Sequence, residues 1–119
     1  MEINRKTISN AWREMGRNID DPATQQELSE FYNKLVDEAY ERSTDYYFQM
    51  REKFLETHTS EEWMQIAVPG TALNHADRAI TRSRQQAAEE IMDEYVHQPL
   101  YDYQRRTNPD PTTDPDNDI

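Results

Sequence analysis

The sequence predicts an all-α fold, an elongated helical bundle with a thin core. Two long segments carry apolar residues at the spacing of an amphipathic helix. Only two glycines occur in 119 residues, too few for the turns that a sheet-rich fold needs. Hydrophobic residues make up 34% of the chain, a share that suits an elongated bundle better than a compact globule. We therefore expect two long antiparallel amphipathic helices, two short helices packed against them and a disordered acidic C-terminal tail.

The first long helix is predicted between Asp21 and Thr57. Asp21 can cap a helix N-terminus, and Pro22 suits the first helical position. The segment Ser43-Thr44-Asp45 favours caps over helix interiors. The apolar pattern continues across it in phase, so we expect one helix, with any bend at this point. The apolar stripe consists of Leu28, Tyr32, Leu35, Ala39, Tyr46 and Met50.

Two short helices are predicted on either side of the first long helix in the sequence. The first covers Lys6–Asn18 and has Trp12 as its largest apolar residue. The second covers Ser60–Val68 and is expected to direct Trp63 and Ile66 into the core. Either tryptophan could also serve as a contact for a partner, but a thin core favours packing.

The second long helix is predicted between Thr71 and His97. Proline lacks a backbone N–H, so we expect Pro99 to end or kink this helix. From residue 107 the chain is rich in proline and aspartate and cannot build a packed core. We therefore expect one helical domain, residues 1–106, followed by a flexible tail, residues 107–119. The apolar stripe of the second helix consists of Leu73, Ala76, Ile80, Ala87, Ile91 and Tyr95.

The order of charges along the second long helix is unusual. Arg78, Arg82 and Arg84 lie in its N-terminal half, and acids fill its C-terminal half. This order opposes the preference of the helix macrodipole. An antiparallel neighbour would explain it, and we expect the arginines to lie near Glu52 and Glu56 of the first long helix.

Composition disfavours several classes of protein. The chain has no cysteine, which excludes disulfides and thiolate metal sites. It contains no apolar run long enough to span a membrane and no secretory leader pattern, so we expect a cytoplasmic protein. The formal net charge of −11 disfavours direct binding to nucleic acid or anionic lipid and favours partners with a basic surface.

No pattern of residues predicts catalysis or cofactor binding. The three histidines lie in separate segments without a nucleophile motif, and two glycines cannot form a phosphate-binding loop. The one metal-like pattern is Glu94-x-x-His97. Di-metal helical bundles use this pattern twice, and here it occurs once. We therefore expect a protein that is not an enzyme and binds neither a metal nor a cofactor.

The first long helix also carries an acidic stripe within an arc of about 100°. We interpret it as the surface of a non-enzymatic protein-binding module. In its most specific form, this is an inhibitor that mimics nucleic acid and occupies a basic site on a partner, such as a nucleic-acid-handling enzyme. In size and charge the chain is similar to small acidic helical bacteriophage proteins that block restriction or CRISPR enzymes. The stripe consists of Glu27, Glu30, Asp37, Glu38, Glu41, Asp45, Glu52 and Glu56.

Charge density limits this interpretation. The stripe carries one carboxylate per about 5.5 Å of helix, whereas duplex DNA carries one charge per about 1.7 Å. Mimicry would therefore need further acids on the same surface, and a solvated helix face is the plainer interpretation. The acids that could contribute are Glu61, Glu62, Glu89 and Glu90.

The alternative function is a structural or assembly subunit of a larger complex, for example a virion component. Such a subunit would pack against its neighbours through its apolar helix stripes. Val36, Tyr47 and Phe54 widen the apolar side of the first long helix. The residues we assign to self-association are Tyr46, Tyr47 and Phe54. Since this helix is longer than the rest of the chain can cover, we expect a homodimer or membership in an assembly.

Overall fold

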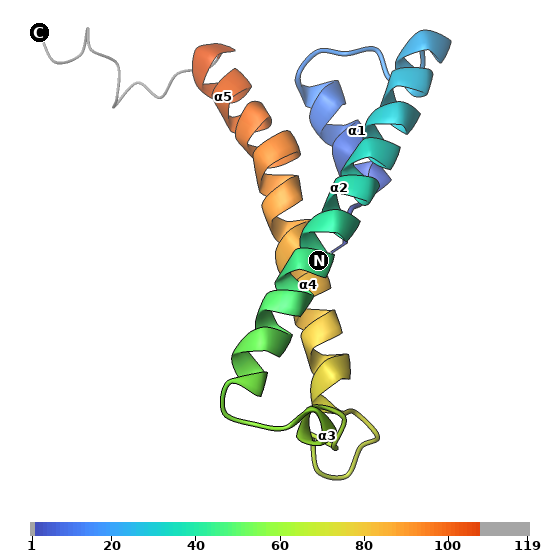
Figure 1. Cartoon of the computed structure of the whole chain (residues 1–119). Helices are drawn as coiled ribbons and strands as arrows, with labels where there is room; N and C mark the ends of the chain where they lie inside the picture. The colour runs from blue at the N-terminus through green and yellow to red at the C-terminus, as the bar shows by residue number, and fades with distance from the viewer. Residues whose placement is uncertain (1, 108–119) are drawn as a thin grey trace, which may run out of the picture.

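The computed structural model describes residues 2–107. These residues form helices joined by loops, and none of them belongs to a β-strand (Figure 1). The predicted all-α class is confirmed for this part of the chain. The predicted tail lies outside the described residues, apart from Thr107, which ends the last helix.

Helix α1 spans Arg5–Glu14 and ends four residues earlier than predicted. The side chain of Asn4 caps its N-terminus. At the other end, Gly16 has a φ of +87°, a left-handed conformation that suits glycine. The N–H of Arg17 donates to the carbonyl of Trp12 at 3.0 Å, which completes a Schellman-type ending. This ending stops the helix.

Helix α2 spans Pro22–Leu55 as one continuous helix of 34 residues, about 51 Å long. Its predicted weak point does not interrupt it. The hydroxyl groups of Ser43 and Thr44 donate to the carbonyl of Tyr40, at 2.8 and 3.0 Å. Hydroxyl groups that bond back to the preceding turn are satisfied inside a helix.

Helix α3 is a single turn, Ser60–Trp63, where the sequence predicted a longer helix. The prediction that Ile66 faces the core is wrong, since this residue is 62% exposed. After α3 the chain enters a loop, in which the N–H of Ala67 donates to the carbonyl of Leu73 at 2.8 Å. Bonds across the loop satisfy backbone groups that a longer helix would otherwise have paired.

The fourth helix, α4, begins at His75, four residues later than predicted. The side chain of Asn74 accepts a hydrogen bond from the N–H of Asp77 at 2.7 Å, and the Asp77 carboxylate accepts one from the N–H of Asn74 at 3.2 Å. This reciprocal capping box satisfies two free donors of the first turn and sets the start of the helix.

Helix α4 spans His75–Met92 and continues through η1, a π-helical turn at Asp93–His97, into α5 at Gln98–Thr107. Pro99 was expected to end or kink the helix, and the first of these two alternatives is wrong, since the helix continues to Thr107. In η1 the N–H of Gln98 donates to a carbonyl five residues earlier, which widens the turn. A wider turn relieves the clash between a proline ring and the carbonyl of the preceding turn.

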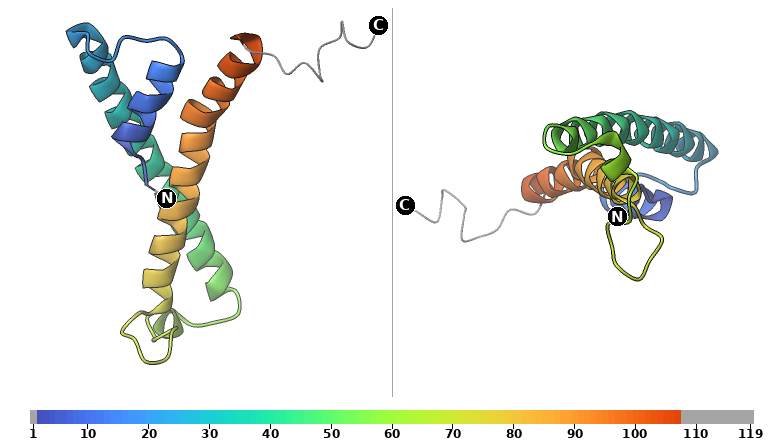
Figure 2. Two further views of the ribbon diagram at one scale, coloured as in Figure 1. Left: turned by 180° about the vertical axis from the view of Figure 1, so that it is seen from behind. Right: turned by 60° about the horizontal axis from the view of Figure 1, so that its bottom comes forward.

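The two long helical rods, α2 and α4–η1–α5, run in opposite directions and cross each other (Figure 1). They diverge on both sides of the crossing instead of lying side by side along their length, as the view from behind also shows (Figure 2). Helix α1 packs in the angle between α2 and α5, and α3 closes the other end (Figure 1). The short helices thus fill the spaces that the crossing leaves open.

Two hydrophobic clusters lie on either side of the crossing, and each buries one of the tryptophans, as predicted. The smaller cluster places Trp63 against Ala76 and Ala79. At the crossing itself the buried residues Ser43 and Ser83 are small, which lets the two helix backbones approach closely. The larger cluster consists of Ile8, Ala11, Trp12, Ile19, Leu28, Leu35, Ile91, Met92 and Val96.

Candidate functional site

The predicted acidic stripe lies on the solvent-facing side of α2. Six of its eight acids are exposed and form no ion pair with another residue of the described range 2–107. Of the other two, Glu27 pairs with Arg17, and Glu38 turns toward the crossing with α4–η1. The six exposed acids are Glu30, Asp37, Glu41, Asp45, Glu52 and Glu56.

An open hollow of about 640 Å³ lies beside this stripe, between α2 and η1. Its one lysine, Lys34, lies over the ring of Tyr95, with Nζ 5.5 Å from the ring centroid. The Oε2 atom of Glu38 is buried and has no hydrogen-bond partner among the described residues. The hollow therefore carries an excess of negative charge. Its lining consists of Glu30, Asn33, Lys34, Asp37, Glu38, Glu41 and Tyr95.

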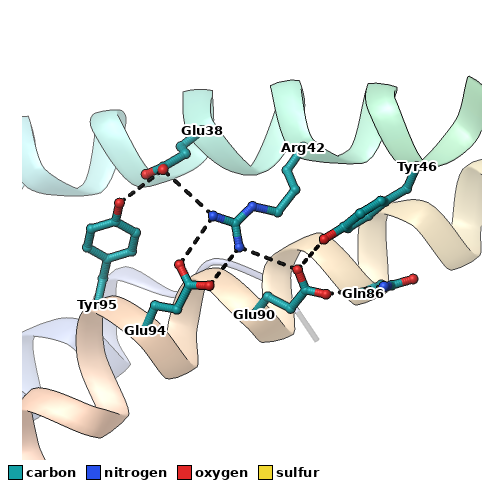
Figure 3. A network of polar contacts seen from close by, with 7 residues as sticks. All are labelled: Glu38, Arg42, Tyr46, Gln86, Glu90, Glu94 and Tyr95. Carbon is teal, nitrogen blue, oxygen red and sulfur yellow. Dashed lines mark hydrogen bonds and ion pairs between the residues drawn. The ribbon is translucent and has the colours of Figure 1, made fainter.

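One flank of the α2–α4 crossing is held by a network around Arg42 (Figure 3). The Nη1 atom of Arg42 lies 3.0 Å from Glu94 and 3.4 Å from Glu90, and its Nη2 atom lies 3.8 Å from Glu38. Nη2 also donates to the second oxygen of Glu94 at 3.2 Å, which makes that pair bidentate. We call this set the polar flank: Glu38, Arg42, Tyr46, Glu90, Glu94 and Tyr95.

Two tyrosines complete the polar flank by donating to its carboxylates. Tyr95 of η1 donates to Glu38 at 2.9 Å, and Tyr46 of α2 donates to Glu90 (Figure 3). The hydrogen bond from Tyr46 lowers the pKa of Glu90. The hydrogen bonds to the carboxylates raise the pKa of both tyrosines, because ionising either phenol would place two anions together. The network thus favours ionised carboxylates and neutral phenols.

The interhelical ion pairs differ from those predicted from the charge order of the second long helix. Arg78 and Arg82 are exposed, and within residues 2–107 neither forms an ion pair with Glu52 or Glu56. The acidic end of α4 and η1 is instead neutralised by Arg42. Arg42 of α2 thus accounts for Glu90 and Glu94, whereas the three arginines in the N-terminal half of α4 form no ion pair within residues 2–107.

Arg42 was not predicted as a site residue. It borders the acidic stripe, and no ion pair between Arg42 and an acid was predicted. The signal that could have found it is its spacing. Glu38, Arg42 and Tyr46 recur every four residues, which places them on one face of α2. Glu90 and Glu94 repeat the same spacing on α4–η1.

The residues assigned to self-association contact other parts of their own chain. Tyr47 and Phe54 are half-buried and pack on Trp63, with ring centroids 5.9 and 5.1 Å apart. The Nε1 atom of Trp63 donates to the hydroxyl of Tyr47 at 3.3 Å. Tyr46 belongs to the polar flank. Contacts of these three residues with a second copy stay a prediction.

The other flank of the crossing is apolar and open to solvent. Tyr40 lies two residues before Arg42, which places the two side chains about 200° apart around α2. Tyr40 and Phe48 are 68% and 53% exposed, and Val36 and Ile80 are exposed near them. Two hollows of about 330 and 300 Å³ lie here, and Tyr40 and Arg84 line both. We call this set the apolar flank: Val36, Tyr40, Phe48, Ile80 and Arg84.

The two residues of the candidate metal pattern, Glu94 and His97, each interact with a different side chain. Glu94 pairs with Arg42, and Nδ1 of His97 lies 2.9 Å from Asp93. Within residues 2–107, no group of three or more histidine, aspartate or glutamate side chains could hold a metal ion.

Comparisons with known protein families, with curated proteins and with solved structures find no match. None of the helices in the described part of the chain is long and apolar enough to cross a membrane.

Proposed function

We propose that this protein is a non-enzymatic binding module whose acidic stripe engages a basic surface on another protein. One observation carries the proposal: six exposed acids have no ion-pair partner in the described chain, and five of them stand on one continuous helix that the sixth, Glu56, caps at its C-terminus. The helix holds their charges at fixed spacings, so that they act together as one rigid negative surface. The net charge of −11 adds long-range attraction for a basic partner.

The acidic hollow supports a contact with arginine or lysine of the partner. Glu30, Asp37 and Glu41 are exposed at its edge. A guanidinium group presents several donors in a planar fork that matches carboxylate geometry. An incoming arginine is therefore the side chain that the hollow fits best.

Mimicry of nucleic acid is the most specific form of this proposal. It requires acids beyond the stripe, and two of the four candidates are engaged within the chain. Glu90 is engaged by Tyr46 and Arg42, and the carboxylate of Glu62 accepts the N–H of Thr59 in the capping box of α3. These two acids add little free charge to the stripe, whereas Glu61 and Glu89 are exposed and form no ion pair within residues 2–107. The charge density of the stripe thus favours a partner with a basic surface in general. It does not by itself favour a partner whose groove is shaped for DNA.

The test compares two triple variants with the same net charge. Asp45→Lys, Glu52→Lys and Glu56→Lys together reverse the C-terminal half of the stripe. Glu14→Lys, Asp20→Lys and Asp102→Lys reverse three exposed acids outside it. Immobilised wild type and both variants are exposed to lysate of the source organism at about 0.05 M and about 0.5 M salt.

We expect wild type and the control variant to retain a basic protein at low salt only, because the interaction is electrostatic. The stripe variant should fail to retain it at either salt concentration. Equal retention by all three proteins, or retention that high salt leaves unchanged, would contradict the proposal.

A second candidate, a structural or assembly subunit such as a virion component, is favoured by the exposed apolar flank. Tyr40 and Phe48 contribute large aromatic surfaces of the kind that dominate protein interfaces. Such an assembly would resist salt, because burial of apolar surface does not depend on charge screening.

A further inference from the structure

We infer that the apolar flank binds a second copy of this chain in a twofold-symmetric dimer, with the acids beside Tyr40 of one copy facing Arg84 of the other. The inference does not depend on the partner proposed for the acidic stripe, although it uses two acids of that stripe, Asp37 and Glu41, which also line the acidic hollow. Three features carry it: exposed aromatic surface, the hollows around Tyr40, and the distribution of charge.

The exposed aromatic surface is the first feature. Tyr40 is 68% and Phe48 is 53% exposed on α2, with Ile80 of α4 exposed across the crossing. These side chains do not belong to either hydrophobic cluster of the described chain. Large aromatic residues contribute most to protein interfaces when a partner removes them from water.

The shape of the flank is the second feature. Tyr40 is largely exposed, yet it lines both hollows, of about 330 and 300 Å³. The same surface therefore offers a projecting aromatic side chain and hollows next to it that can receive one. Self-complementarity of this kind is what a twofold interface requires, because each copy presents the same patch to the other.

The distribution of charge is the third feature, and it favours a second copy over a different partner. Asp37 lies one helical turn before Tyr40, and Glu41 lies one turn before Thr44, which lines a hollow. Arg84 lines both hollows from α4, and Glu2 lines the hollow of about 330 Å³. Within residues 2–107, none of Asp37, Glu41 and Arg84 forms an ion pair.

The apolar flank thus has an acidic edge on α2, Asp37 and Glu41, and a basic residue, Arg84, on α4. A twofold axis lying between these edges places the acidic edge of each copy against Arg84 of the other. A partner with charge of a single sign would match one edge and be repelled by the other. A second copy matches both.

The first test measures oligomeric state by sedimentation velocity, from about 1 μM to about 1 mM protein, a range that covers weak and moderate dimers. Wild type should sediment increasingly as a dimer as the concentration rises. Tyr40→Ser and Phe48→Ser should sediment as monomers with unchanged far-ultraviolet circular dichroism. Tyr101→Ser is the matched control, since Tyr101 is 53% exposed on α5, and it should dimerise like wild type.

The second test mixes two charge variants. Arg84→Glu alone and the pair Asp37→Arg with Glu41→Arg alone should each dimerise at least ten-fold more weakly than wild type, because like charges then face each other. Mixed together, they should form a heterodimer, because each supplies the charge that the other lacks.

Three results would overturn the inference. The first is a wild type that stays monomeric throughout the concentration range. The second is a dimer that Tyr40→Ser and Phe48→Ser leave intact or that Tyr101→Ser disrupts. The third is a mixture of the charge variants that associates no better than either variant alone.

Discussion

On the polar flank of the helix crossing, Arg42 connects three carboxylates and two tyrosines donate to the same acids, whereas on the apolar flank Tyr40 and Phe48 are mostly exposed. Both flanks belong to the same pair of helices, and Tyr40 precedes Arg42 by only two residues. The side chains of the polar flank form hydrogen bonds and ion pairs within the chain. The large apolar side chains of the apolar flank are exposed and available to a partner.

This difference shows which residues define the fold and which are available for binding. Hydrogen bonds and ion pairs depend on direction, so the polar flank fixes how α2 lies against α4 and η1. Apolar side chains at the rim of a crossing impose no such geometry. Changes on the polar flank should therefore alter stability, and changes on the apolar flank should alter association.

The largest effect is expected at a fully buried position of α4. Ala87 is fully buried in α4, so Ala87→Leu should overpack the interior and lower the free energy of unfolding by about 3 kcal/mol. Urea unfolding measures this loss. Gln85→Leu, at an exposed position of the same helix, is the control and should change stability by less than about 0.5 kcal/mol. Equal stability of the two variants would show that Ala87 is not tightly packed.

The polar flank alone is tested by Arg42→Ala. Without its guanidinium group, Glu38, Glu90 and Glu94 repel one another across the crossing. We expect a loss of about 2 kcal/mol, less than for a fully buried pair because these side chains are partly exposed to water. The urea midpoint should fall for this variant and stay near that of wild type for Arg13→Ala, whose side chain is exposed on α1. A urea midpoint that does not change in Arg42→Ala would show that the network around Arg42 does not stabilise the fold.

A smaller effect on the free energy of unfolding is expected when Glu90 is protonated at low pH. The hydrogen bond from Tyr46, followed by those from Gln86 and Arg42, lowers the pKa of Glu90 in the folded state. A carboxylate of this kind stabilises the fold above its unfolded pKa of about 4.3, and the stabilisation disappears as the pH falls through the folded pKa. Glu90→Gln should therefore cost about 1 kcal/mol near neutral pH and less in acid.

Unfolding of wild type and Glu90→Gln at about pH 7 and about pH 3 measures this dependence directly. The difference in unfolding free energy between the two proteins should shrink as the pH falls. A difference that stays constant with pH would show that the charge of Glu90 does not contribute to stability.

The smallest effect on stability is expected on the apolar flank. Tyr40→Ser removes an exposed ring with no partner in either cluster. At protein concentrations too low for dimers, it should change the unfolding free energy by less than about 0.5 kcal/mol. A loss comparable to that of Arg42→Ala would mean that the apolar flank supports the monomer and would erase the contrast between the flanks.

Features decided by neighbouring residues could be predicted from the sequence. The capping box of Thr59 and Glu62 forms with both of its hydrogen bonds, and the amphipathic pattern correctly placed Leu28 and Leu35 in the core. Each depends on contacts within a few residues or on one helix face.

Features decided by distant residues could not be predicted. The spacing of apolar residues does not encode the crossing, so Ile80 and Ile66 were expected in contact with the core and are exposed instead. Pro99 was expected to end or kink the helix; it does not end it, because the π-helical turn before it accommodates the ring. For the candidate site, the sequence located the acids of α2 and placed Val36 and Ile80 on the apolar sides of their helices. It did not indicate that Tyr40, Phe48 and Arg84 join them on one flank, because these residues come from two helices.

The most direct test of the contrast between the two flanks is a dilution series followed by ¹H–¹⁵N correlation NMR, from about 1 mM to about 10 μM protein. The account predicts concentration-dependent shifts at the apolar flank, for Tyr40, Phe48 and Arg84, and none at Glu94 or Tyr95 of the polar flank. Shifts confined to the polar flank, or a spectrum that does not change on dilution, would contradict it.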